Sequence, residues 1–155
     1  IAVFDQVAAK LMSGLTTIAG EDRTIVPAIN GAGVIAPTNL HGIDFDPASG
    51  SIIVSDVGSA ASPTDGKIYV IPNAERANGL TDISVNIAGP NSLLGNPVDV
   101  MYDGNNLFVA EKSNGLIMRF DNVLSSAGGD VVANSSAPLL GAESVAVLPS
   151  YINRL

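Results

Sequence analysis

Short apolar runs separated by turn residues recur along the chain in a fixed order. Residues 42–46 and 97–101 form one kind of run, and residues 52–56 and 107–111 form the next kind. The two kinds are joined by short polar segments containing Gly or Asn, which favour tight hairpin turns. Runs of this length, rich in Val, Ile and Phe, predict β-strands rather than helices.

Two further kinds of strand complete the cycle. A strand followed by a polar pair recurs at 1–4, 68–71 and 117–120, and a short strand before a glycine recurs at 16–19 and 86–89. Each strand of the first of these kinds leads into a small-residue segment that ends in glycine. We expect one helical turn in each of the three connectors. Asp5 and Asp121 are expected to cap two of these turns, and the segments end at Gly14, Gly79 and Gly128.

Four short strands per repeat are typical of a β-propeller, in which each repeat is one four-stranded antiparallel blade. The sequence therefore predicts an all-β fold, with residues 1–155 forming a single propeller domain or a segment of one. The order opens on a third strand and ends with an innermost strand at 144–148 and the start of a second at 151–155. That gives about three blades and an incomplete ring, because closed propellers have about four to eight. Other blades of a longer chain, or further copies of this one, would complete the ring.

The same pattern predicts which side chains are buried and which segments are loops. Alternate residues of the innermost strands are expected between blades: Ile43, Phe45, Val98, Val100, Val145 and Val147. The stretches 21–40 and 58–66 are expected to be loop insertions.

Composition narrows the possible partners. The net charge is −8 and no cluster of Lys or Arg exists, which disfavours nucleic acid and anionic membrane surfaces. No run approaches the roughly eighteen apolar residues of a membrane span. The chain has no cysteine, so disulfides and thiolate chemistry are excluded, although an oxidising compartment remains compatible.

Several of these strings are similar to a known group. The segments GIDFDPASGSIIVSD, NPVDVMYDGNNLFVAEKSNGLIMRFDNV and VNIAGPNSLLGNPVDV resemble blades of NHL-type and lactonase-like bacterial propellers, including secreted repeat proteins of unknown function. The resemblance implies a propeller fold and an extracellular or periplasmic location. It does not imply one function, because propellers carry many activities.

Asp44 and Asp99 are the strongest candidate site residues. They occupy matching positions in two innermost strands, which line the central channel of a propeller. Two carboxylates at one level could hold a cation such as Ca²⁺. Alternatively, they cap strand ends or accept hydrogen bonds from loop amides. Ala146 takes the matching position in the third repeat and interrupts the ring of carboxylates.

Other motifs carry weaker signals. The stretch 44–50 superficially resembles a calcium loop but lacks the EF-hand spacing, so a hairpin turn is expected. His41, the one histidine, has no Ser/His/Asp constellation around it and is interpreted as a loop residue. Residues 31–33 lack the third glycine and the strand–turn–helix context of a dinucleotide site, and are interpreted as loop.

The resemblance adds one further candidate set. In gluconolactonase-like propellers, acidic and amide residues near the channel bind a divalent metal that polarises a lactone. Asp56, Glu111 and Asn114 stand at or just after the ends of second strands, where such ligands would lie. The sequence reproduces no complete ligand set.

Two functions stay open on this basis. The first is a non-catalytic secreted scaffold or interaction module, with no cofactor, which is favoured because the chain shows no cluster of nucleophile and base. The second is a calcium-dependent hydrolase of the lactonase type. A ring of Asp, Glu and Asn side chains converging on the channel would favour the second. An RNA-binding platform is disfavoured by the acidic charge.

Overall fold

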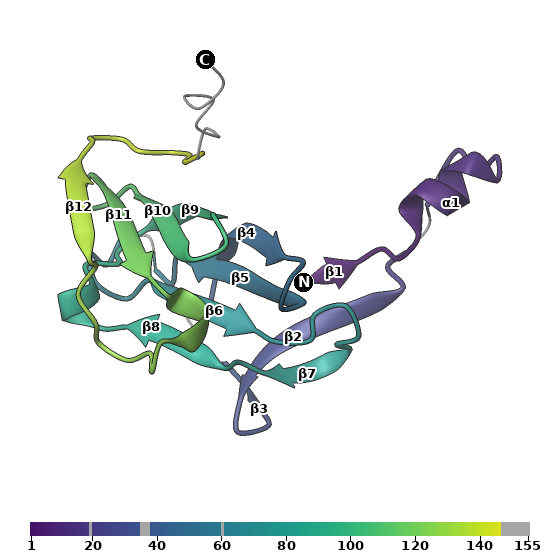
Figure 1. Cartoon of the computed structure of the whole chain (residues 1–155), viewed down its shortest axis with the longest axis horizontal. Helices are drawn as coiled ribbons and strands as arrows, with labels where there is room; N and C mark the ends of the chain where they lie inside the picture. Colours follow the sequence, from purple (N-terminus) through teal and green to yellow (C-terminus); the bar gives the residue numbers. More distant parts are fainter. Residues whose placement is uncertain (19, 35–37, 60, 147–155) are drawn as a thin grey trace, which may run out of the picture.

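The computed structural model describes residues 1–155 except 19, 35–37, 60 and 147–155. The described part consists mainly of strands (Figure 1). The strands are β1 (Ala2–Val3), β2 (Arg23–Ile29), β3 (Ala32–Gly33), β4 (Leu40–Asp46), β5 (Ser51–Asp56), β6 (Lys67–Ile71), β7 (Gly79–Asp82), β8 (Val85–Ala88), β9 (Pro97–Tyr102), β10 (Asn106–Glu111), β11 (Leu116–Asp121) and β12 (Ser135–Pro138). The helical segments are α1 (Val7–Met12) and the 3₁₀ turns η1 (Pro90–Ser92) and η2 (Val123–Ser125). Within the described residues, no helix is long and apolar enough to cross a membrane.

Two of the three sheets follow the predicted strand order. One has the order β4-β5-β6-β8 and the other β9-β10-β11-β12, and all neighbours in both are antiparallel. The strands expected at 42–46, 52–56, 68–71, 86–89, 97–101, 107–111 and 117–120 are confirmed to within a few residues. Neither sheet closes on itself, and the two pack face to face through a shared core (Figure 1).

A backbone feature repeats after each third strand. Gln6, Asn73 and Asn122 all have positive φ, at 54°, 53° and 52°. Asn tolerates this left-handed conformation better than most residues, and here it turns the chain out of the sheet. The three connectors thus begin with a left-handed residue at the same point of the repeat, although they differ in length and conformation afterwards.

The expected aspartate caps are wrong. The residue that precedes α1 is Gln6 and the residue that precedes η2 is Asn122, and neither makes a side-chain cap hydrogen bond. Asp5 instead pairs with Arg23, and Asp121 pairs with Arg119. Asp5 therefore binds a guanidinium on the neighbouring strand β2, and Asp121 binds one two residues earlier on its own strand β11.

The N-terminal sheet differs most from the strand order predicted from the sequence. β1 is the expected third strand, but residues 16–18 of the expected fourth strand belong to no strand, and residue 19 lies outside the described residues. β2, inside the expected loop 21–40, pairs antiparallel with β1 instead, with Val3 opposite Arg23. The α1 connector is longer than its counterparts, so the fourth strand begins later in the chain.

β2 also pairs in parallel with β7, with Ile25 opposite Gly79, and its far end forms a hairpin with β3. This parallel pairing departs from the expected antiparallel blade. It has a counterpart in the next repeat, where β8 forms an isolated parallel bridge between Ile87 and Gly129. In both places the fourth strand of one repeat pairs in parallel with the connector of the following repeat.

The end of the described chain also differs from expectation. β12 is an unpredicted fourth strand, and residues 144–146 of the expected innermost strand are not extended in a sheet. The rest of that strand, and the second strand start at 151–155, lie outside the described residues. Ser135, Ser136 and Ala137 lack the β-branched side chains on which the sequence prediction relied.

The burial prediction holds for the residues of β9 but not for those of β4. Val98 and Val100 are buried, at 8% and 4% exposure, whereas Ile43 and Phe45 are 52% and 43% exposed. Val145 is partly buried against Val98 and Ala110, and Val147 lies outside the described residues. Ile43 and Phe45 were expected between blades, but they point toward β1, where only two strand residues cover them.

The main core lies between the two complete sheets. It contains side chains from β5, β6, β8, β9, β10 and β11, including Ile53, Ile68, Val70, Val100, Val109 and Phe120. Two smaller clusters lie on the outer faces, one between β2 and the β4–β8 sheet and one beyond β9 and β10. The two complete sheets therefore each have one cluster on either face.

Candidate functional site

Asp44 and Asp99 connect neighbouring strands through backbone amides. Asp44 Oδ2 accepts a hydrogen bond from the Tyr102 amide on β9 (2.6 Å), and its Oδ1 accepts one from the Phe45 amide (2.8 Å). Asp99 Oδ2 accepts from the Ser144 hydroxyl (2.6 Å) and the Val145 amide (3.0 Å). Each carboxylate thus connects the first strand of its sheet to the segment packed beside it, β9 for Asp44 and residues 144–145 for Asp99. This is the amide-binding alternative left open by the sequence, and calcium binding stays a prediction.

A close backbone approach brings β4 and β9, the first strands of the two complete sheets, together. A Cβ on Gly42 of β4 would lie 2.7 Å from Asp99 Cα and 2.9 Å from Val100 N on β9, so only glycine fits. The neighbouring His41 Nδ1 lies 3.0 Å from the Val98 carbonyl oxygen. A carbonyl can only accept, so His41 donates from Nδ1. His41, expected as a loop residue, is instead an exposed residue of β4 that links it to β9.

Asp56 ends β5 and is fully buried. Its Oδ1 accepts from the Asn39 amide (2.7 Å) and the Gly58 amide (2.9 Å), and its Oδ2 accepts from the Tyr69 hydroxyl (3.0 Å). Burial first, and then the charge of Asp56, raises the pKa of Tyr69 well above its usual range. The phenol is therefore held as a neutral donor to the carboxylate.

Glu111 occupies the matching position at the end of β10 and is also fully buried. Its Oε1 accepts from the Gly95, Asn96 and Ser113 amides, and its Oε2 accepts from the Asn114 amide (2.6 Å). The Asn114 side chain donates to the carbonyls of Pro63 (3.0 Å) and Leu93 (2.9 Å). Asp56, Glu111 and Asn114, the candidate ligands taken from the lactonase resemblance, thus all form hydrogen bonds with backbone groups of nearby loops.

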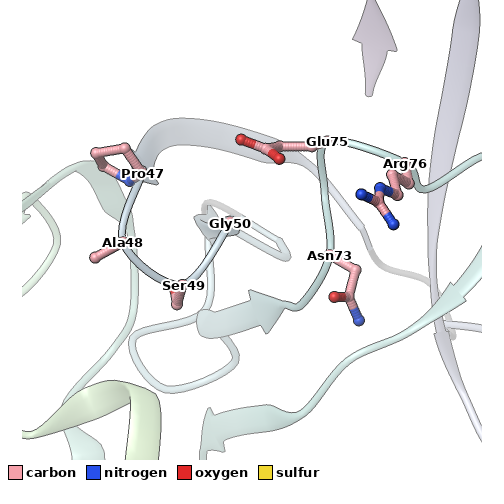
Figure 2. Close-up of a pocket in the computed structure, with 7 residues that line it drawn as sticks. All are labelled: Pro47, Ala48, Ser49, Gly50, Asn73, Glu75 and Arg76. Carbon is pink, nitrogen blue, oxygen red and sulfur yellow. The ribbon is translucent and has the colours of Figure 1, made fainter.

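The pocket in Figure 2 lies beside the β4–β5 turn and encloses about 310 Å³. The turn residues Pro47–Gly50 form one side, and Asn73, Glu75 and Arg76 of the connector after β6 form the other. Beneath the turn, hydrogen bonds from the Ser49 side chain and from the Ser49 and Ala48 amides hold the pKa of Asp46 below its usual range. Glu75 and Arg76 bring one negative and one positive charge to the lining, so the charge of this pocket does not select anions or cations.

The stretches 44–50 and 31–33, which superficially resemble ligand-binding motifs, both belong to hairpins. The 44–50 stretch joins β4 to β5, and Gly50 closes the turn with φ of 68° while its amide donates a hydrogen bond to the Asp46 carbonyl (2.9 Å). Asn30 and Gly31, with φ of 52° and 75°, join β2 to β3. The second is a two-residue hairpin turn, which is the commonest use of an Asn-Gly pair.

Sequence reasoning missed Arg23. Its guanidinium donates to both Asp5 oxygens (2.7 and 2.8 Å) and to the carbonyls of Ala74 (3.1 Å) and Ala77 (2.5 Å). These contacts join β2 to the entry of α1 and to the connector after β6. Arg23 lies in the stretch interpreted as a loop, where no strand pattern marked it as a pairing residue.

A comparison with protein-family models gives no match, and neither does a comparison with curated proteins. Among the described residues, no three His, Cys, Asp or Glu side chains are grouped closely enough to share a metal ion. The candidate carboxylates Asp44, Asp56, Asp99 and Glu111 each accept hydrogen bonds from backbone amides, which is a structural use of their charge.

Proposed function

We propose that this chain is part of a secreted β-propeller that acts as a non-catalytic scaffold or interaction module. The proposal rests on acidic side chains that have the same structural role at matching positions of the repeat. Asp56 and Glu111 end matching strands, and each fastens the loops around it through backbone amides. Asp44 and Asp99 also match, and each links one strand to the next segment in the stack.

The stacking order supports the propeller part of the proposal. Two four-stranded antiparallel sheets follow one another along the chain, and a third begins with β1 and β2. The innermost strands β4 and β9 lie next to each other through Gly42. Sheets that stack with their first strands together radiate from a common axis, as blades do. The secreted location rests on the resemblance to bacterial repeat proteins.

The calcium-dependent lactonase remains the competing proposal, and calcium binding distinguishes the two. We expect the Tm of the protein to be the same in Ca²⁺ and in EDTA, and lactones to show no calcium-dependent hydrolysis. Asp99→Ala should lower the Tm equally in both buffers, because it removes acceptors for Ser144 and Val145.

A ligand role gives the opposite pattern. Calcium would then raise the Tm of the wild type, and Asp99→Ala would abolish that rise. Asp103→Asn, in the exposed turn between β9 and β10, is the matched control because it changes a carboxylate outside the candidate site. Calcium-dependent lactone hydrolysis would replace the scaffold proposal with the hydrolase.

A further inference from the structure

In both junctions inside the chain, the connector after a third strand binds the fourth strand of the preceding unit. The connector after β6 does so through the parallel β2–β7 pairing, in which Ile25 is opposite Gly79. The connector after β11 does so through the parallel bridge between Ile87 and Gly129. Ile25 and Ile87 are both fully buried. The same contact, in the same orientation, therefore holds both junctions of the stack.

The fourth strand of the last sheet, β12, has no such connector among the described residues. In β8, Ile87 lies opposite Ile68. In β12, Ala137 lies opposite Ile117, which matches Ile68 in the repeat. Ala137 is exposed, as is all of β12, and β11 is the one described strand that pairs with it. A free strand edge presents unpaired N–H and C=O groups, so β12 offers the edge that β2 and β8 use to bind a connector.

The outer face beside β12 is also open. A hollow of about 170 Å³ lies on β10, β11 and β12, and Phe108 and Ile117 line it while partly exposed. The matching residues of the preceding sheet, Ile53 and Ile68, are fully buried in the core between the two complete sheets. We call Phe108, Ile117 and β12 the closing face.

The first connector, residues 6–14, has no preceding fourth strand among the described residues. Its helix α1 has six residues, none of them buried, and it lies apart from the sheets (Figure 1). Val7 is 37% exposed, whereas the matching residues Ala74 and Val123 are buried. An isolated helix needs about 12–15 residues to be stable in water, so α1 needs a surface to pack on.

β1 is open on the same side of the repeat. Val3 and Ile25 belong to the cluster that covers the β4–β8 sheet, so one face of β1 is already packed. Phe4 alternates with Val3 and points out of that cluster. It is 45% exposed, whereas the matching Phe120 is 3% exposed in the core between the complete sheets. We call Phe4, Val7 and the rest of the connector the opening face.

We propose that the opening face of one copy binds the closing face of a second copy of this chain, head to tail. The residues after α1 add in parallel to the free edge of β12, with Gly14 opposite Ala137, as Gly79 is opposite Ile25 inside the chain. Phe4 then packs on the outer face of β10–β12.

The partner is a second copy because each surface has what the other lacks. The opening face is a connector without a fourth strand, and β12 is a fourth strand without a connector. The proposal rests on the stacked sheets of the proposed function and names the partner of that scaffold. A head-to-tail contact is heterologous, so it builds a ring when the rotation closes and a filament when it does not.

Light scattering after size exclusion tests the assembly on the intact chain. We expect a mass above the 15.7 kDa of one chain, rising with protein concentration. Val7→Glu should block the opening face and Ala137→Glu the closing face, so each variant alone should be a monomer. Two exposed alanines provide matched controls that should self-associate like the wild type. Ala9→Glu changes the side of α1 opposite Val7, and Ala48→Glu changes a turn of the middle sheet.

Mixing makes the test directional. Val7→Glu keeps an intact closing face and Ala137→Glu keeps an intact opening face, so a mixture should form a discrete 1:1 complex. Circular dichroism establishes that each variant retains its strand content.

Disulfide cross-linking tests the register, because the chain has no cysteine of its own. Parallel pairing with Gly14 opposite Ala137 places Ser13 of one copy opposite Ser136 of the other. Under mild oxidation, Ser13→Cys chains mixed with Ser136→Cys chains should form a covalent dimer. Ser125→Cys, at an exposed residue of η2, is the control and should not cross-link to Ser13→Cys.

A wild type of 15.7 kDa at every concentration would overturn the assembly. Self-association that survives Ala137→Glu but not Val7→Glu would also overturn it, since that result indicates a symmetric contact between two opening faces. Aggregates that neither variant dissolves, or associated chains that do not cross-link as described, would do the same. A folded monomer without calcium-dependent activity leaves the scaffold proposal standing, whereas calcium-dependent hydrolysis by a head-to-tail assembly overturns only the scaffold proposal.

Discussion

At the scale of single residues, buried carboxylates accept the hydrogen bonds of loop amides that would otherwise need a backbone carbonyl. Each complete sheet ends its second strand with a carboxylate that has no exposed surface, Asp56 or Glu111. A buried charge is costly unless it is fully hydrogen-bonded, and both groups meet that condition through backbone amides. The loops around each acid are therefore ordered by one side chain, and changing it should affect the whole turn.

Glu111→Gln tests this dependence. The substitution keeps the size of the side chain but puts an NH₂ group where an oxygen accepts amides, so a donor faces a donor. We expect a loss of roughly 2–4 kcal/mol in the free energy of unfolding, measured by urea denaturation. Glu143→Gln is the control, because Glu143 is exposed and pairs with Lys112, and its loss should stay below about 1 kcal/mol. Equal losses would contradict the anchoring role.

Tyr69 makes stability sensitive to alkaline pH. Burial and the nearby Asp56 raise the pKa of the folded phenol above its ordinary value of 10.0. Above pH 10 the unfolded chain releases this proton and the folded chain keeps it, so stability falls as the pH rises. Melting temperatures from pH 8 to 11 should decline less steeply for Tyr69→Phe than for the wild type. Parallel declines would show that Tyr69 keeps an ordinary pKa.

At the scale of elements, the sequence predicts strands well where β-branched residues alternate and poorly where pairing depends on loop length. The first, second and third strands of both complete sheets follow their pattern. β12 does not, because Ser135 and Ser136 gain strand conformation only by pairing with β11. β2 was missed because the length of the α1 connector, rather than the likeness of 17–20 to 86–89, sets where the fourth strand begins.

The candidate site was predictable in position but not in role. Matching positions in the repeat singled out Asp44 with Asp99, and Asp56 with Glu111. Their partners are amides from loops and from the next strand in the stack, which no periodicity reveals. Ile43 and Phe45 follow the burial pattern of their repeat, yet burial depends on a neighbouring sheet that β1 and β2 supply only in part.

Gly42→Ala tests the contact between the innermost strands. The new Cβ would lie 2.7 Å from the Asp99 backbone, so β4 and β9 must separate. We expect a loss of roughly 1–3 kcal/mol in unfolding free energy, as for other overpacked positions. Gly33→Ala is the control, since its Cβ would meet only Leu80 Cδ2 at 3.8 Å. If urea denaturation gives the two variants similar stability, the close approach of β4 and β9 is wrong.

At the scale of the whole molecule, stability should divide along the stack of sheets. The two complete sheets share one large core, whereas the N-terminal unit joins them through the β2–β7 pairing, a small cluster and the Arg23 contacts. In stacked repeats, stability is approximately a sum of unit and interface contributions. The N-terminal unit should therefore open more readily than the rest of the chain.

Arg23→Lys tests this division, because lysine keeps the charge but loses the planar fork that binds Asp5 and two carbonyls together. Native-state hydrogen exchange should show faster exchange of amides in β2 and β7, while amides in β9, β10 and β11 keep their protection. The reason is that local opening breaks only the contacts of the unit that opens. Lys10 offers a matched control, since Lys10→Gln removes the exposed pair with Asp22 and should leave β7 unchanged. Faster exchange across all three sheets in Arg23→Lys would show instead that the stack unfolds as one cooperative unit.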